Sequence, residues 1–169
     1  MYKIGDKVIV NDRMQRSYEY DVSERPGNNF GPGFEPHLSP KEMLQMGIFE
    51  GKYCNDCRVE LPSDWFENAK ISEFPDPALN YFSIKSRQSL TIWQSKGWIV
   101  GPDPRGWFQW YCRYFLGRRL PDIDHHQIKR WRAFKRHEAQ VIINCESGNW
   151  ACRPRQRQAL LQWAYNPNI

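Results

Sequence analysis

The sequence predicts a mainly α-helical fold with a small β or irregular N-terminal part (α+β), arranged as a compact single domain over residues 1–169. Helix-start signals followed by apolar residues three and four positions apart recur from residue 39 onward. Alternation of polar and β-branched residues is confined to residues 3–10. A chain of 169 residues with 15% aromatic content can bury one sizeable core, and no internal repeat or long polar linker divides it.

The N-terminal part, residues 1–38, is expected to contain one strand and a long irregular loop. The alternation in residues 3–10 is typical of a short strand. Pro26, Gly27 and the run 31–33 (GPG) indicate turns, so residues 11–38 are expected to be irregular. A loop of this length usually has a function or a partner.

Residues 39–169 are expected to form a helical body whose C-terminal half is basic. Ser39 and Glu42 form a capping box around a proline at the first helical position, and Gly47 marks the end of this helix. Further helices are expected over residues 62–70 (capped by Ser63), 86–96, 103–117 (capped by Asp103, ended by Gly117), 124–144 (capped by Asp124 with Gln127) and from about 154 to Pro167.

Segment 103–119 (DPRGWFQWYCRYFLGRR) contains six aromatic residues between positions 107 and 115. Trp107, Trp110, Tyr111 and Tyr114 are spaced i, i+3, i+4 and i+7, which places them on one helical face and is typical of a core. We expect the two tryptophans to be buried while Tyr111 or Tyr114 reaches the edge of a pocket. The alternative is an exposed platform on which nucleic-acid bases stack.

Charge is distributed unevenly along the chain. Residues 1–80 carry 9 Lys and Arg against 14 Asp and Glu, residues 81–169 carry 15 against 5, and the net charge is +5. This asymmetry favours a polyanionic partner for the basic half. In a helix over 124–144, Lys129, Arg132 and Arg136 would form one stripe that can follow a phosphate backbone.

Arginine dominates this basic block, which favours bidentate contacts to phosphates or bases. The candidate nucleic-acid-binding residues are Tyr111, Arg113, Arg118, Arg119, Lys129, Arg130, Arg132 and Arg136. Two alternatives remain open. The basic residues could be a solvated helix face paired with the acidic N-terminal half, or they could bind an acidic protein.

Five cysteines are spread along the chain. The N-terminus lacks a signal-peptide pattern and no apolar run is long enough to span a bilayer, so we expect a cytoplasmic protein without structural disulfides and without a membrane partner. Cys54 and Cys57 have zinc-knuckle spacing, and with Cys145 and Cys152 they could form a zinc site. The alternative is free, buried thiols, which is also the expectation for Cys112. No other cofactor is expected.

Catalytic candidates are few. Asp122, Asp124 and His125 form a cluster that could provide a general acid and a general base. The alternative is helix capping, because carboxylates at a helix N-terminus are stabilised by the helix dipole. The chain contains no phosphate-binding glycine loop, nucleophile elbow or zinc-protease motif.

Several runs resemble a family of small uncharacterised proteins found in tailed phages, notably those of cyanobacteria, and in cellular genomes. The runs are 34–44 (FEPHLSPKEML), 51–53 (GKY), 103–119, 127–131 (QIKRW) and 157–165 (RQALLQWAY). The resemblance covers residues 34 to 165, and its long motif is specific. It implies one intact domain and a phage or bacterial setting, with the host cytoplasm as the location if a phage encodes the chain. It assigns no activity and no catalytic residue.

Together these features predict a nucleic-acid-binding protein, with DNA favoured over RNA, that acts as a small phage or bacterial accessory factor. One alternative is an enzyme acting on nucleotides or modified bases, such as a glycosylase or hydrolase. Another is a protein–protein adaptor or inhibitor that docks through residues 11–38. The nucleic-acid-binding hypothesis depends on the basic stripe. The enzyme hypothesis requires a pocket in which the acid–base cluster meets the aromatic segment, and the adaptor hypothesis depends on residues 11–38.

Overall fold

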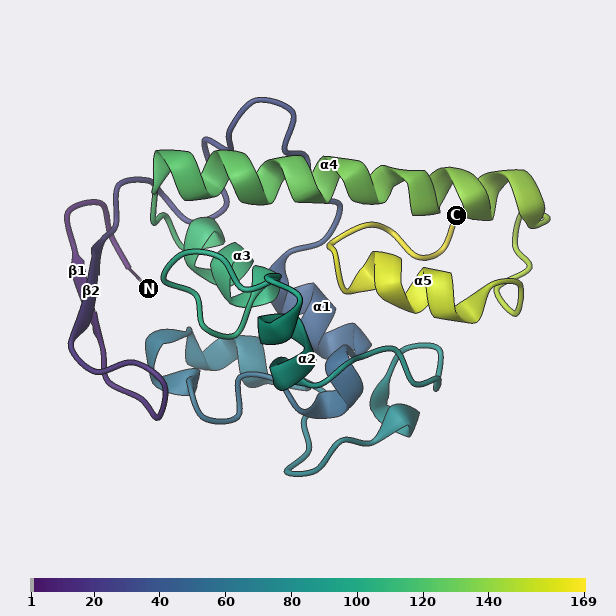
Figure 1. Ribbon diagram of the computed structural model, residues 1–169, viewed down its shortest axis with the longest axis horizontal. Coiled ribbons are helices and arrows are strands. Elements are labelled where there is room, and N and C mark those ends of the chain that lie inside the picture. The colour runs from purple at the N-terminus through teal and green to yellow at the C-terminus, as the bar shows by residue number, and fades with distance from the viewer. Residues whose placement is uncertain (1) are drawn as a thin grey trace.

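The computed structural model describes residues 2–169 and confirms a mainly helical fold with a small sheet (Figure 1). The strands are β1 (Lys7–Val10) and β2 (Tyr18–Asp21), and the α-helices are α1 (Pro40–Met46), α2 (Leu90–Ser95), α3 (Trp107–Phe115), α4 (Pro121–Asn144) and α5 (Pro154–Leu161). Four short 3-10 turns are η1 (Phe49–Gly51), η2 (Arg58–Glu60), η3 (Ser63–Phe66) and η4 (Pro77–Leu79). Within residues 2–169 no helix combines the length and the apolar character that a membrane span requires.

The sheet is a two-stranded antiparallel hairpin, with Val8 opposite Tyr20 and Val10 opposite Tyr18. β1 confirms the predicted strand, whereas β2 lies in a segment that was expected to be irregular, so that expectation is wrong for residues 18–21. Sequence YEYD contains two acidic residues and is a weak strand pattern by itself. It becomes a strand because Tyr20 packs with Val8, Val10 and Val22 in a small buried cluster.

The start of α1 follows the sequence pattern closely. The Ser39 hydroxyl accepts a hydrogen bond from the Glu42 amide (3.3 Å), and the Glu42 carboxylate accepts one from the Ser39 amide (2.7 Å). The capping box is therefore confirmed, as is the end of the helix at Gly47. Two other helices differ from expectation: residues 62–70 form only the 3-10 turn η3, and α2 begins after Ser89, which caps it, rather than at residue 86.

Helix α3 lies at the centre of the molecule (Figure 1). It begins at Trp107 instead of being capped by Asp103, because the Asp103 carboxylate pairs with arginine side chains. Its end at Gly117 is confirmed: this residue has φ +107°, and a side chain there would collide with the carbonyl oxygen of Glu24.

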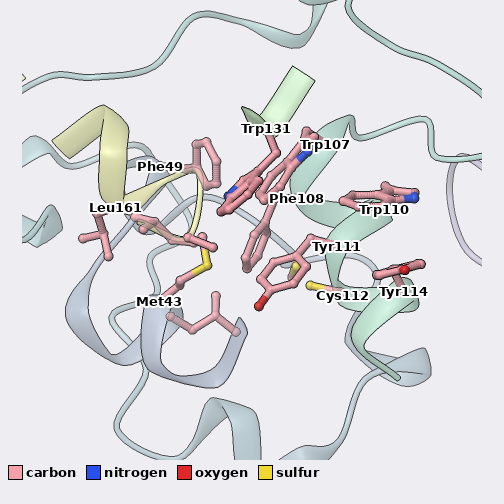
Figure 2. Packing of buried hydrophobic residues seen from close by; sticks show 14 of the residues in the cluster. Met43, Phe49, Trp107, Phe108, Trp110, Tyr111, Cys112, Tyr114, Trp131 and Leu161 are labelled. Carbon is pink, nitrogen blue, oxygen red and sulfur yellow. The ribbon is translucent and has the colours of Figure 1, made fainter. Parts of the chain in front are cut away.

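The aromatic face of α3 forms the core, as Figure 2 shows. Tyr111 and Tyr114 are both buried, so the expectation that one of them reaches the edge of a pocket is wrong. The Tyr111 hydroxyl donates to the Leu38 carbonyl (2.7 Å), and the Tyr114 hydroxyl accepts from the Gly31 amide (2.7 Å). Phe34 packs edge-on against both tyrosines, with ring centroids 5.6 and 5.7 Å away. These contacts fix the second half of the 11–38 segment on α3.

Helix α4 runs along one edge of the molecule, with α5 packed against its C-terminal part (Figure 1). It begins at Pro121, before the predicted cap. The buried Asp124 carboxylate still accepts from the Leu120 amide (2.7 Å), and it also accepts from Trp110 Nε1 (2.8 Å). Asp124 therefore ties the start of α4 to the core helix.

Cys145 and Cys152 form a disulfide that joins the end of α4 to the turn before α5. The expectation of a chain without structural disulfides is therefore wrong, and the cytoplasmic location stays a prediction. The seven-residue separation alone did not indicate a pair, because the intervening turn that brings the two sulfurs together is not visible as a pattern.

Reducing this disulfide is expected to lower the free energy of unfolding by about 2 to 3 kcal/mol, because the unfolded chain regains the entropy of a short loop. The measurement is urea denaturation with and without reductant. A variant with Cys145→Ser and Cys152→Ser is the control, since it should unfold at one urea concentration under both conditions. An equal response to reductant in this variant would show that the other cysteines cause the effect.

Candidate functional site

Two of the predicted nucleic-acid-binding arginines lie in the interior. Arg113 is completely buried and forms a two-pronged ion pair with Glu60 (2.8 Å for both bonds) as well as one with Asp103 (2.9 Å). Arg118 is also buried and holds both oxygens of Asp103 (2.8 and 2.6 Å). With Tyr111 buried too, these three residues are not accessible to nucleic acid, which corrects their assignment.

Both buried arginines stay charged. Burial alone would lower the pKa of Arg113, but its bonds to Glu60 and Asp103 raise that pKa overall, and Asp103 does the same for Arg118. A third arginine of segment 103–119, Arg105, is buried between carboxylates of the N-terminal half, Asp12 and Asp56. Carboxylates of the acidic half, Asp12, Asp56 and Glu60, therefore neutralise Arg105 and Arg113 in the interior.

Arg119 is half-buried and acts as a clamp on the N-terminal loop. Its guanidinium donates to the carbonyls of Tyr114 (2.6 Å) and Asn28 (2.8 Å) and lies 4.0 Å from the centre of the Tyr114 ring. Burial lowers its pKa. Its donors already serve backbone carbonyls, so its contribution to a binding surface is small.

Four exposed basic residues lie on α4. Lys129, Arg132, Lys135 and Arg136 are exposed, and within residues 2–169 none of them lies within ion-pair distance of a carboxylate. Lys129, Arg132 and Arg136 follow one side of the helix at i, i+3 and i+7. Arg132 also bonds to the carbonyls of Pro32 and Gly33, so the N-terminal loop crosses this side of α4. We call these four residues the basic face.

The predicted acid–base cluster is divided between the surface and the interior. Asp122 and His125 are exposed near the start of α4, and Asp124 is buried on Trp110 and Leu120. Burial raises the pKa of Asp124, and Asp124 is not among the residues that line the three pockets formed by residues 13–14, 49–108, 130–134 and 155–163.

The cysteines predicted as zinc ligands are not brought together. Cys145 and Cys152 are bonded to each other, whereas Cys54 and Cys57 are free, buried thiols near Cys112. Among residues 2–169 no group of three or more His, Cys, Asp or Glu side chains has the arrangement of a metal site. The four-cysteine assignment is therefore corrected.

A pocket of about 450 Å³ lies between α2, α3, α4 and α5, a size in the range of small-molecule sites. Seven of its lining residues are aromatic, and three of these, Phe49, Trp107 and Phe108, are labelled within the core cluster in Figure 2. The aromatic lining residues are Phe49, Trp93, Trp98, Trp107, Phe108, Phe134 and Trp163. We call this the aromatic pocket.

The charged lining residues of the aromatic pocket are cationic. Lys85, Arg87, Arg130 and Arg155 line it, and its lining contains no acidic residue among those the structure describes. Arg87 is neutralised by Glu50 (3.1 Å), outside the lining. Arg130 lies 5.4 Å from the centre of a lining ring, that of Trp163, and burial lowers its pKa.

Only one predicted site residue, Arg130, contributes to the aromatic pocket. Successive helical residues are about 100° apart, so Arg130 and Phe134 share one side of α4 while Lys129, Arg132 and Arg136 lie on another. The basic face and the pocket are therefore separate. Sequence reasoning missed the pocket because its walls come from several distant segments, although Trp98, Arg155 and Trp163 each stand out as aromatic or basic residues near helix ends.

The chain matches no protein-family model, no curated protein and no solved structure. The resemblance of segment 103–119 to phage proteins thus stays a prediction.

Proposed function

We propose that the protein binds nucleic acid, with DNA favoured, by electrostatic contact between the basic face of α4 and the phosphate backbone. The observation that carries the proposal is the set of four exposed cations without a carboxylate partner in the described part of the chain. Exposed cations that are not neutralised internally are available to displace the counterions that condense on a polyanion.

The geometry of α4 suits an extended ligand. Lys129 and Arg136 are seven residues apart, which corresponds to about 10 Å along the helix axis. The two ends of the basic face can therefore contact successive phosphates of one strand. Lys129 and Arg136 also make no side-chain hydrogen bond to the rest of residues 2–169, so ligand binding breaks no existing contact of theirs.

The phage or bacterial accessory role forms part of the same proposal and is supported by the resemblance of segment 103–119. The interior ion pairs of Arg105 and Arg113 give that segment a structural role, because they hold the acidic N-terminal half against the core. An enzymatic role has no comparable support, since Asp122 and His125 lie on an exposed helix end.

Binding should be detectable as an increase in fluorescence anisotropy of labelled single- and double-stranded DNA of about 20 nucleotides at low salt, and it should disappear at high salt. Labelled RNA of the same sequence tests the preference for DNA. Absence of binding to every strand at about 50 mM salt would contradict the proposal. In that case retention of a host protein on the immobilised chain would favour the adaptor alternative.

A further inference from the structure

We propose that the aromatic pocket is a binding site for a nucleoside phosphate, whose base packs among the aromatic walls and whose phosphate is held by Arg130 and Arg155. This site lies apart from the basic face, so the inference goes beyond the proposed contact with a nucleic-acid backbone.

The aromatic walls favour a planar, apolar ligand part. Trp98 is the most exposed of them, with 40% of its surface accessible, and Trp93 and Trp163 are half-buried beside it. Clustered tryptophan rings at a surface are unfavourable in water unless they serve a contact. Flat ligands such as nucleobases stack on these rings and remove their apolar surface from water, whichever base is present.

The charge of the pocket selects an anion. Arg130 uses only Nη1 for hydrogen bonds, to the Trp98 carbonyl and to Gln127 Oε1 (2.9 Å each), so its Nε and Nη2 donors stay free within the described chain. It is half-buried and has no carboxylate counterion there, which makes an incoming phosphate its first ionic partner. Arg155 is exposed, lines the same pocket and likewise has no ion pair among residues 2–169.

The combination narrows the ligand class. Purely apolar molecules would leave the partly desolvated Arg130 unpaired, whereas inorganic phosphate would leave the rings exposed. A nucleoside phosphate satisfies both, whether it is a free nucleotide or the terminal unit of a strand. The polar lining residues Ser86 and Gln88 can meet the hydrogen-bonding edge of a base.

Four tryptophans line the pocket, so intrinsic fluorescence provides the readout. Titration with adenosine monophosphate and thymidine monophosphate should quench the fluorescence in a saturable way. Adenosine without phosphate should bind at least about tenfold more weakly, and inorganic phosphate alone should leave the fluorescence unchanged. A 5′-phosphorylated dinucleotide that competes with the free nucleotide would identify a strand terminus as the source of the ligand, and failure to compete would identify the free nucleotide.

Two variants locate the site. Trp98→Ala removes a wall and Arg155→Gln removes a phosphate contact, and each should weaken nucleotide binding by about tenfold. Trp150→Ala, which removes a 53% exposed tryptophan outside the pocket, and Lys129→Gln on the basic face should leave it unchanged. Equal affinity for nucleoside and nucleotide, equal loss in Trp150→Ala, or no saturable quenching would each overturn the inference. DNA binding by the basic face is measured separately, by anisotropy. Loss of nucleotide binding and loss of DNA binding can therefore be told apart.

Discussion

Replacing Asp103 by alanine is expected to lower the free energy of unfolding by about 3 to 5 kcal/mol. Asp103 is completely buried and pairs with two buried arginines, Arg113 at 2.9 Å and Arg118 at 2.6 Å. Its removal leaves Arg118 without a carboxylate partner and Arg113 with Glu60 alone. A buried charge without a partner is strongly destabilising, because water no longer solvates it.

Urea denaturation of the variant and the wild type measures this loss. The matched control is Asp64→Ala, which removes a half-exposed carboxylate that pairs at 2.8 Å with Lys41, itself partly exposed. Exposed ion pairs contribute little, so this variant should lose less than about 1 kcal/mol. If Asp103→Ala does not fold, Asp103→Asn retains the size of the side chain and should be intermediate. Similar losses for Asp103→Ala and Asp64→Ala would contradict the interior role of the arginine pair.

Reversing two charges of the basic face, with Lys129→Glu and Arg136→Glu, is expected to weaken single-stranded DNA binding at low salt by about tenfold or more. Both residues are exposed, so the change should not affect folding, whereas Arg132 also supports the N-terminal loop and is left in place. Two attractive contacts become repulsive, and counterions are no longer released at these positions.

The control is a second double variant that changes the net charge by the same amount at residues outside α4. Arg16→Glu with Arg25→Glu alters two exposed arginines of the N-terminal segment, outside α4. Fluorescence anisotropy at one low salt concentration should give near wild-type affinity for the control. If both double variants weaken binding equally, net charge rather than the basic face determines affinity.

Local patterns in the sequence predicted those parts of the fold that depend on neighbouring residues. The capping box of Ser39 and Glu42 and the end of α3 at Gly117 follow from backbone hydrogen bonds and from φ +107°, which are decided within a few residues. The periodicity of segment 107–114 likewise predicted a core helix. These features could therefore be predicted without the tertiary structure.

The placement of Arg113 and Arg118 could not be predicted in this way. Their carboxylate partners are Glu60, 53 residues away from Arg113, and Asp103, which looked like a helix cap. An arginine within an aromatic run has the same sequence pattern whether its guanidinium pairs with a buried carboxylate or binds a phosphate of a ligand. Only the fold decides which of the two is present.

The same limit applies to the pocket, to β2 and to the disulfide. Each depends on segments that are distant in sequence or on a turn without a strong pattern, such as residues 146–151. Lys129, Arg132 and Arg136 were predicted correctly as one helical stripe, because i, i+3 and i+7 spacing is a local property. Their role in binding is the part that experiment has to decide.

The salt dependence of DNA binding tests this role most directly. Association constants measured by anisotropy across a range of salt concentrations should give a straight line of negative slope when both axes are logarithmic. The neutral variant Lys129→Gln with Arg136→Gln should flatten that slope by about 1.4 for a single strand, since each lost phosphate contact removes about 0.7. Parallel lines for the wild type and this variant would contradict phosphate binding by the basic face of α4.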